Sequence, residues 1–172
     1  MITESSRLIL SEFHPSEGSF YYALNNDPEV LKYTGDDSFE SVEAATNFLK
    51  HYNHYKHFGY GRWTVTLKET NKPIGWCGLK YHKEQDYVDL GYRFLRSEWG
   101  EGYATEAALA SLKIGFTEYK MPFIVGRTAR QNHGSIRVLE KVGMTFWKAE
   151  ACEGIEDSLI YRVDREEFIG KF

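Results

Sequence analysis

Three consecutive segments in the middle of the chain have the spacing of β-strands joined by short polar turns. They span residues 63–67, 74–79 and 87–95, and the first alternates strictly between the two faces of a strand. This arrangement predicts an antiparallel meander. Gly91 stands inside the third segment, where it indicates either a β-bulge or a place where another group approaches the backbone closely.

The rest of the chain alternates between the two kinds of secondary structure. Further strands are predicted at residues 7–13, 121–128, 144–151 and 157–163. Helices, delimited by capping and breaking residues, are predicted at residues 16–25, 41–57, 103–119 and 132–142. The third helix has several alanines on its apolar stripe, so we expect it to pack closely on its neighbour. No internal repeat or linker is visible, and residues 1–172 therefore predict a single α+β domain with a mixed sheet.

The bulk composition excludes several classes of partner. The formal net charge is −4, and scattered Lys and Arg residues offer no basic surface to nucleic acid. No apolar run approaches the roughly 20 residues that cross a bilayer, and the first residues lack the pattern of a signal peptide. We therefore expect no nucleic-acid partner, no membrane association and a cytoplasmic location.

The residue types that bind metals are not arranged as a metal site. Cys77 and Cys152 lie far apart in apolar surroundings and are expected to be reduced core thiols. His51, His54 and His57 are spaced by three residues, but this spacing drifts around a helix and no carboxylate completes a ligand set. We expect the histidines at the surface or at the rim of a substrate site, and no bound metal.

A loop with two glycines connects the third strand of the meander to the alanine-rich helix. Gly100 and Gly102 precede a helix N-terminus, whose unpaired N–H groups and positive dipole end favour an anion such as a pyrophosphate. The same pattern also occurs in simple tight turns. The P-loop sequence Gly-Lys-Ser/Thr is absent, and the third glycine of a dinucleotide-binding loop is replaced by Thr105.

A second motif gives the glycine loop a more definite meaning. Residues 132–144, Asn-His-Gly-Ser-Ile-Arg-Val-Leu-Glu-Lys-Val-Gly-Met, follow a predicted strand and open a helix. Together with Asp-Leu-Gly-Tyr-Arg at 89–93 and Trp-Gly-Glu-Gly-Tyr-Ala-Thr-Glu at 99–106, this sequence resembles the GNAT N-acetyltransferases, and in particular their RimJ/RimL branch. The resemblance extends over nearly the whole chain. It implies a mostly antiparallel sheet of about seven strands with helices on both faces.

The resemblance also implies an activity and a set of ligands. The chain would transfer the acetyl group of acetyl-CoA to a primary amine, either a protein or peptide N-terminus or a small amine. A homodimer is also implied, because GNAT relatives are often dimers. The acetyl group would enter a gap between the strands at 87–95 and 121–128. The residues implied in cofactor binding are Phe94, Leu95, Arg96, Trp99, Gly100, Glu101, Gly102, Tyr103, Ala104, Asn132 and Ser135.

Two positions depart from the family pattern. The loop motif begins with Ser97 in place of Gln or Arg, although Arg96 stands beside it. Many members have a tyrosine, which protonates the leaving thiolate, where this chain has Leu139. An inactive GNAT-fold module that binds acyl-CoA or mediates an interaction is therefore the alternative hypothesis.

Two residues are candidates for the chemistry of transfer. Asp89, on the strand beside the expected gap, is the candidate base that helps to deprotonate the amine; alternatively it is a solvated surface carboxylate. Ser135 is the candidate donor to the thiolate, unless its hydroxyl only satisfies the helix N-terminus. Glu106 is expected to have a structural role at the start of its helix, and His133 to be solvated.

Overall fold

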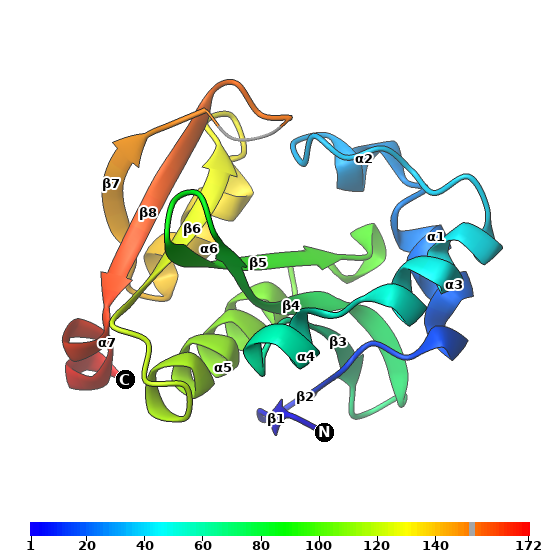
Figure 1. The fold of residues 1–172 in the computed structure, drawn as a ribbon, viewed down its shortest axis with the longest axis horizontal. Helices are drawn as coiled ribbons and strands as arrows, with labels where there is room; N and C mark the ends of the chain where they lie inside the picture. Colours follow the sequence, from blue (N-terminus) through cyan, green and yellow to red (C-terminus); the bar gives the residue numbers. More distant parts are fainter. Residues whose placement is uncertain (152–153) are drawn as a thin grey trace.

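The protein is built on one sheet of eight strands, in the order β1-β2-β3-β4-β5-β6-β8-β7. The computed structural model describes residues 1–151 and 154–172 (Figure 1). The strands are β1 Thr3–Glu4, β2 Leu8–Ser11, β3 Arg62–Leu67, β4 Lys72–His82, β5 Tyr87–Phe94, β6 Phe123–Ala129, β7 Thr145–Ala149 and β8 Ser158–Asp164. All neighbours are antiparallel except β5 and β6.

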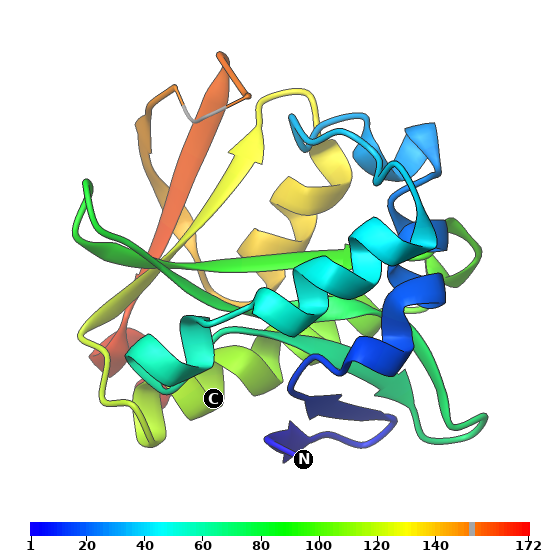
Figure 2. The ribbon, with the colours of Figure 1, turned by 45° about the vertical axis from the view of Figure 1, so that its right-hand side comes forward.

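Helices cover both faces of this sheet, as predicted (Figure 2). Their bounds are η1 Pro15–Glu17, α1 Gly18–Leu24, α2 Pro28–Leu31, α3 Val42–His51, α4 His54–Phe58, η2 Arg96–Glu98, α5 Tyr103–Thr117, α6 His133–Lys141 and α7 Arg165–Lys171. Helices α5 and α6 pack on one face, over the main core, whereas α1 and α3 form a second core on the other. The α+β class and the mostly antiparallel sheet are therefore confirmed.

The predicted element list is wrong in a few places. An eighth strand, β1, pairs with β2 over only two residues, which is too short for any periodicity to show. The helix expected at 41–57 is two helices, because Tyr52 has an extended backbone. The break lets the hydroxyls of Tyr52 and Tyr55 both bond to the backbone of Arg62. Helix α2 was not predicted, although Asp27 caps it, and α7 was not predicted either.

Helix α5 lies against β4 and β5, and small side chains allow its close approach. Ala107, Ala108 and Ser111 are fully buried on its sheet-facing side. At Gly115 an added Cβ would lie 2.9 Å from the Ile124 side chain, closer than real contacts allow. The expectation drawn from the alanine stripe is confirmed, and it fixes the start of α5 relative to the end of β5.

The predictions about cysteines, membrane-spanning segments and metal sites can be compared with the described residues. Cys77 is buried, whereas Cys152 lies outside the described residues. Within residues 1–151 and 154–172, no helix is long and apolar enough to cross a bilayer. In the same part of the chain, no cluster of three or more His, Cys, Asp or Glu side chains is placed to hold a metal ion.

Candidate active site

Strands β5 and β6 diverge after a short parallel contact, as expected for the gap between them. Their pairing is confined to Asp89 opposite Val125 and Leu90 opposite Gly126, and beyond these residues the strands separate (Figure 1). A cavity of about 630 Å³ occupies the opening and is lined by residues from both faces of the sheet. This volume lies within the usual range for small-molecule sites.

The glycine loop at the end of β5 has the geometry expected of an anion cradle. Gly100 and Gly102 have φ angles of +84° and +81°, in the left-handed region that favours glycine. Gly102 is the N-cap of the 15-residue helix α5 and provides no side-chain cap. The first N–H groups of this helix therefore have no intrahelical or capping partner, and they fit the pyrophosphate of a CoA thioester.

The start of the chain holds this loop in place. The Arg7 guanidinium donates to the Glu101 carbonyl oxygen at 3.0 Å and forms an ion pair with Glu106 at 2.6 Å. It also stacks 4.5 Å from the Tyr103 ring centroid. Glu106 in addition accepts from the Ser5 hydroxyl at 2.7 Å. The expected structural role of Glu106 fits this arrangement, although its side-chain partners come from the turn between β1 and β2.

The backbone around Phe94 and Leu95 is less available than the resemblance implies. The Leu95 N–H donates to Ile74 in β4, and its carbonyl accepts from Glu98. Alternate residues of a strand direct their backbone N–H and C=O groups to opposite edges. The backbone groups of Phe94 therefore point toward the gap, where the carbonyl oxygen accepts from the Trp99 indole at 3.0 Å. Of the two residues whose backbone was expected to pair with pantetheine, only Phe94 is oriented to do so.

The other residues predicted to bind the cofactor lie around the glycine loop and at the start of α6. Arg96 forms an ion pair with Asp27, with 3.0 Å between Nε and Oδ2, and Ala104 is in the first turn of α5. Asn132 is the N-cap of α6, and its side-chain oxygen accepts from the Ser135 N–H at 3.2 Å. His133 is exposed.

Tyr92 is a functional candidate that the sequence analysis missed. Its hydroxyl lies 2.9 Å from Ser135 Oγ and 3.1 Å from the Ser135 carbonyl oxygen. Burial raises the pKa of Tyr92, so that the phenol stays protonated at neutral pH. Tyr92 and Leu139 both line the cavity, and Leu139 itself is buried against Gly126. The phenol therefore stands beside the position where the family's tyrosine is missing.

Asp89 lies on the opposite face of β5 from Tyr92. Its buried carboxylate forms an ion pair with Arg62 at 2.8 Å and contacts the His82 imidazole at 3.3 Å. Burial alone would raise the pKa of Asp89, but Arg62 and His82 outweigh it and hold the pKa well below its usual range. The alternative of a solvated carboxylate is therefore wrong. So acidic a group is a weak base, and its geometry fits the positioning of Arg62 and His82.

Gly91 makes this ion pair possible. A Cβ at Gly91 would lie 2.6 Å from the Arg62 guanidinium carbon. The register between β4 and β5 continues unbroken past this residue. The expected close approach is therefore confirmed, and the alternative of a bulge is wrong. The sequence predicted that some group approaches the backbone at Gly91. It could not identify that group as the side chain of Arg62, which is 29 residues earlier.

The three histidines of the 51–57 segment have separate roles. His54 lines the cavity and bridges two elements, since Nδ1 contacts the Tyr60 carbonyl oxygen and Nε2 accepts from the Tyr81 N–H at 3.1 Å. His51 and His57 each contact a carbonyl oxygen one turn earlier in their own segment. The expected rim position is therefore occupied by His54 alone of the three.

Comparison with known proteins gives the family. The family model described as an acetyltransferase (GNAT) domain matches residues 7–145. The uncharacterised protein YkkB of Bacillus subtilis is 32% identical over 151 residues, 86% of each chain. The uncharacterised N-acetyltransferase p20 of Bacillus licheniformis is 29% identical, covering 96% of this chain and 97% of p20.

A solved structure agrees with this assignment. The GNAT-family acetyltransferase of Bacillus anthracis superimposes with a TM-score of 0.82 at 27% identity, covering 95% of this chain and 98% of that one. Proteins of this family use acetyl-CoA as the acyl donor. The chain therefore belongs to the GNAT acetyltransferase family and is an N-acetyltransferase.

Proposed function

We propose that this protein transfers the acetyl group of acetyl-CoA to a primary amine that enters from the α1–α3 side of the sheet. The observation that carries the proposal is the cavity between β5 and β6. Tyr92, Asn132 and Ser135 line it together with Arg62, His82 and Asp89, which belong to the opposite face of the sheet. A thioester held on one face therefore meets an acceptor held on the other.

In this proposal the cofactor-binding residues are those expected from the sequence, except that Leu95 contributes no free backbone group. The first-turn N–H groups of α5 bind the pyrophosphate, and Phe94 pairs with the pantetheine arm. The Asn132 amide group, whose oxygen caps α6, donates to the same arm. Because these contacts use the backbone, Ser97 in place of Gln or Arg leaves the cradle intact.

The chemistry needs a neutral amine, attack on the acetyl carbon and a proton for the departing thiolate. The amine nitrogen forms the new C–N bond as the C–S bond breaks, and the proton of the amine passes to water in the cavity. Tyr92 gives a proton to the thiolate with Ser135 holding the phenol in position, and water then reprotonates Tyr92. Asp89 positions Arg62 and His82 beside the acceptor.

The test is release of the CoA thiol over a panel of amines, with the acetylated product identified by mass. Thiol release together with an acetylated amine supports the proposal. Binding of CoA without thiol release from any acceptor would support the alternative of an inactive module. Membership of the RimJ/RimL branch, the homodimer and the cytoplasmic location stay predictions from the sequence.

A further inference from the structure

Four aromatic side chains form a continuous wall on the acceptor side of the cavity. The wall comprises Phe13, Phe39, Phe48 and Tyr52, all of which line the cavity. Ring centroids are 5.6 Å apart between Phe39 and Phe48, 6.1 Å between Phe48 and Tyr52, and 4.7 Å between Tyr52 and Phe13. Such separations are typical of aromatic pairs in protein cores.

One ring of this wall is partly exposed to solvent. Phe48 has 48% of its surface accessible although it contacts two other rings. A lone exposed phenylalanine on a protein surface needs no explanation. Here the exposed ring belongs to a cavity wall with three further aromatic side chains, so that an apolar or aromatic group entering the cavity would remove it from water.

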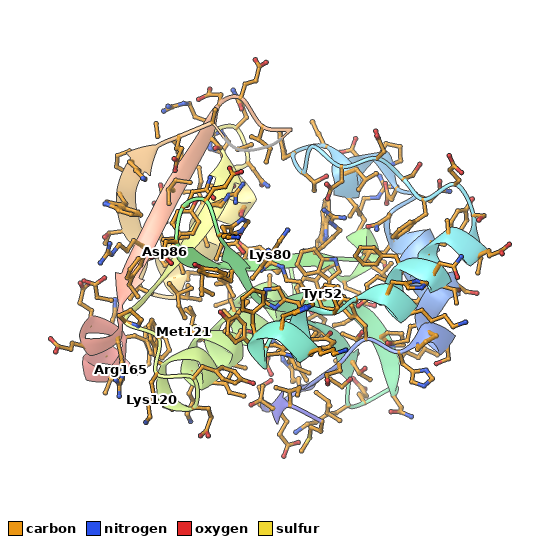
Figure 3. All side chains as sticks on the ribbon, in the orientation of Figure 1. Tyr52, Lys80, Asp86, Lys120, Met121 and Arg165 are labelled. Atoms are coloured by element: carbon orange, nitrogen blue, oxygen red, sulfur yellow. The ribbon has the colours of Figure 1, made fainter. Side chains whose placement is uncertain are left out.

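The charges of the cavity do not favour a polycation. Among the described lining residues, Asp89 is neutralised by Arg62 and Asp36 by Arg93, whose ion pair measures 2.6 Å. Lys80 adds a further positive charge to the lining to which Tyr52 also belongs (both labelled in Figure 3). A surface that binds several ammonium groups at once needs unneutralised carboxylates facing them. Asp37 is a third carboxylate and Arg127 a further cationic side chain of this lining, so that the described lining holds three carboxylates against four Lys and Arg side chains and has no excess of acid.

Two loops meet above the cavity and limit what can enter. Gly35, after α2, and Gly154, before β8, are in backbone contact, because a Cβ at Gly35 would lie 2.6 Å from the Gly154 carbonyl oxygen (Figure 1). Residues flanking this contact, among them Asp36 and Ile155, line the cavity. The contact therefore bounds the acceptor side of the cavity at this edge.

We infer that the acceptor is a small primary monoamine whose amine is attached to an aromatic or bulky apolar group. The aromatic wall binds that group, and the amine points to the gap between β5 and β6. The inference rests on the proposed function and names the substrate class of the same site. It also separates this chain from an enzyme for polyamines or for protein N-termini.

The experiment compares four acceptors under identical conditions with acetyl-CoA. These are 2-phenylethylamine, propylamine, spermidine and a short peptide with an N-terminal phenylalanine. Because burial of an aromatic ring contributes strongly to binding, we expect kcat/KM for 2-phenylethylamine to exceed that for propylamine and spermidine by at least ~10-fold. Equal or better use of spermidine or propylamine would overturn the inference, and so would preferential use of the peptide.

A pair of variants ties the preference to the wall. Phe48→Ala should lower the ratio of kcat/KM for 2-phenylethylamine to that for propylamine by roughly 10-fold, because only the aromatic amine contacts the ring. Phe146→Ala is the matched control, since Phe146 is 56% exposed on β7 and outside the cavity lining. An unchanged ratio in Phe48→Ala would overturn the inference. Absence of thiol release with every amine would instead refute the proposed function, and this inference with it.

Discussion

Replacing Tyr92 by phenylalanine removes one oxygen atom and leaves the ring in place. Within the described part of the folded chain, that oxygen forms hydrogen bonds with Ser135, at 2.9 Å to Oγ and 3.1 Å to the carbonyl oxygen. The structural loss is therefore at most that of two ordinary hydrogen bonds, about 1–3 kcal/mol in the free energy of unfolding. The fold should survive, so that the effect on catalysis can be measured separately.

The catalytic loss expected from the same change is much larger. A positioned proton donor contributes about 10²–10⁴-fold to a rate, and each tenfold step is about 1.4 kcal/mol in the activation free energy. Tyr92→Phe should thus raise the barrier to acetyl transfer by roughly 3–5 kcal/mol. A purely structural role would lower the rate by less than about tenfold, given the stability loss above.

The assay is single-turnover acetyl transfer, followed by thiol release and compared with the affinity for CoA. Ser135→Ala is the control, because it removes the side-chain hydrogen bond to Tyr92 but leaves the phenol. We expect a large loss in Tyr92→Phe with unchanged CoA affinity, a smaller loss in Ser135→Ala, and partial recovery of Tyr92→Phe with an aryl thioester whose thiolate needs no proton. A rate for Tyr92→Phe within about threefold of the unchanged protein would refute the reasoning.

Three further predictions concern the cradle and the buried ion pair. Gly102→Val places a β-branched residue at a φ of +81°, which costs about 1–3 kcal/mol; calorimetry should show CoA affinity lowered at least ~10-fold, and unchanged affinity would contradict the pyrophosphate assignment. Asp89→Asn leaves Arg62 without its carboxylate and should lower the free energy of unfolding in urea by about 3–5 kcal/mol. Asp157→Asn, at an exposed pair, should change it by less than about 1 kcal/mol; equal losses would argue against the buried pair. The pKa of Asp89 is lowered on folding. The contribution of this carboxylate to the free energy of unfolding should therefore be complete above about pH 4 and disappear as the pH falls further. Thermal melts of Asp89→Asn should show a weaker dependence on pH in that range than melts of the unchanged protein.

Much of the secondary structure follows from local sequence, because the spacing of apolar residues and the positions of turn residues are visible within a few neighbouring positions. The meander at β3–β5 and the helix after the glycine loop were predicted in this way. The elements that escaped are those that tertiary contacts create. Strand β1 pairs over two residues only, and the break at Tyr52 depends on hydroxyl bonds to Arg62 across the fold.

The site shows the same division more sharply. Gly100 and Gly102 belong to a short motif before a helix whose spacing suggested an anion site, and the role of Asn132 was expected from the family resemblance. The contacts of Asp89 with Arg62 and His82 depend on strand register, since these two residues come from β3 and β4. Tyr92 could have been noticed as a residue of the strand face that meets α6, but its contact with Ser135 joins positions 43 residues apart.

The alternation of β5 explains how one strand can serve two substrates. Asp89, Gly91 and Arg93 face α1 and α3, where Arg62 passes over the bare backbone of Gly91 to reach Asp89. Leu90, Tyr92 and Phe94 face α5 and α6. The strand separates the two sets everywhere except beyond its contact with β6, where the cavity joins both sides. A phenol on β5 can therefore supply the proton that other family members take from α6, so that Leu139 in the core is compatible with an active enzyme.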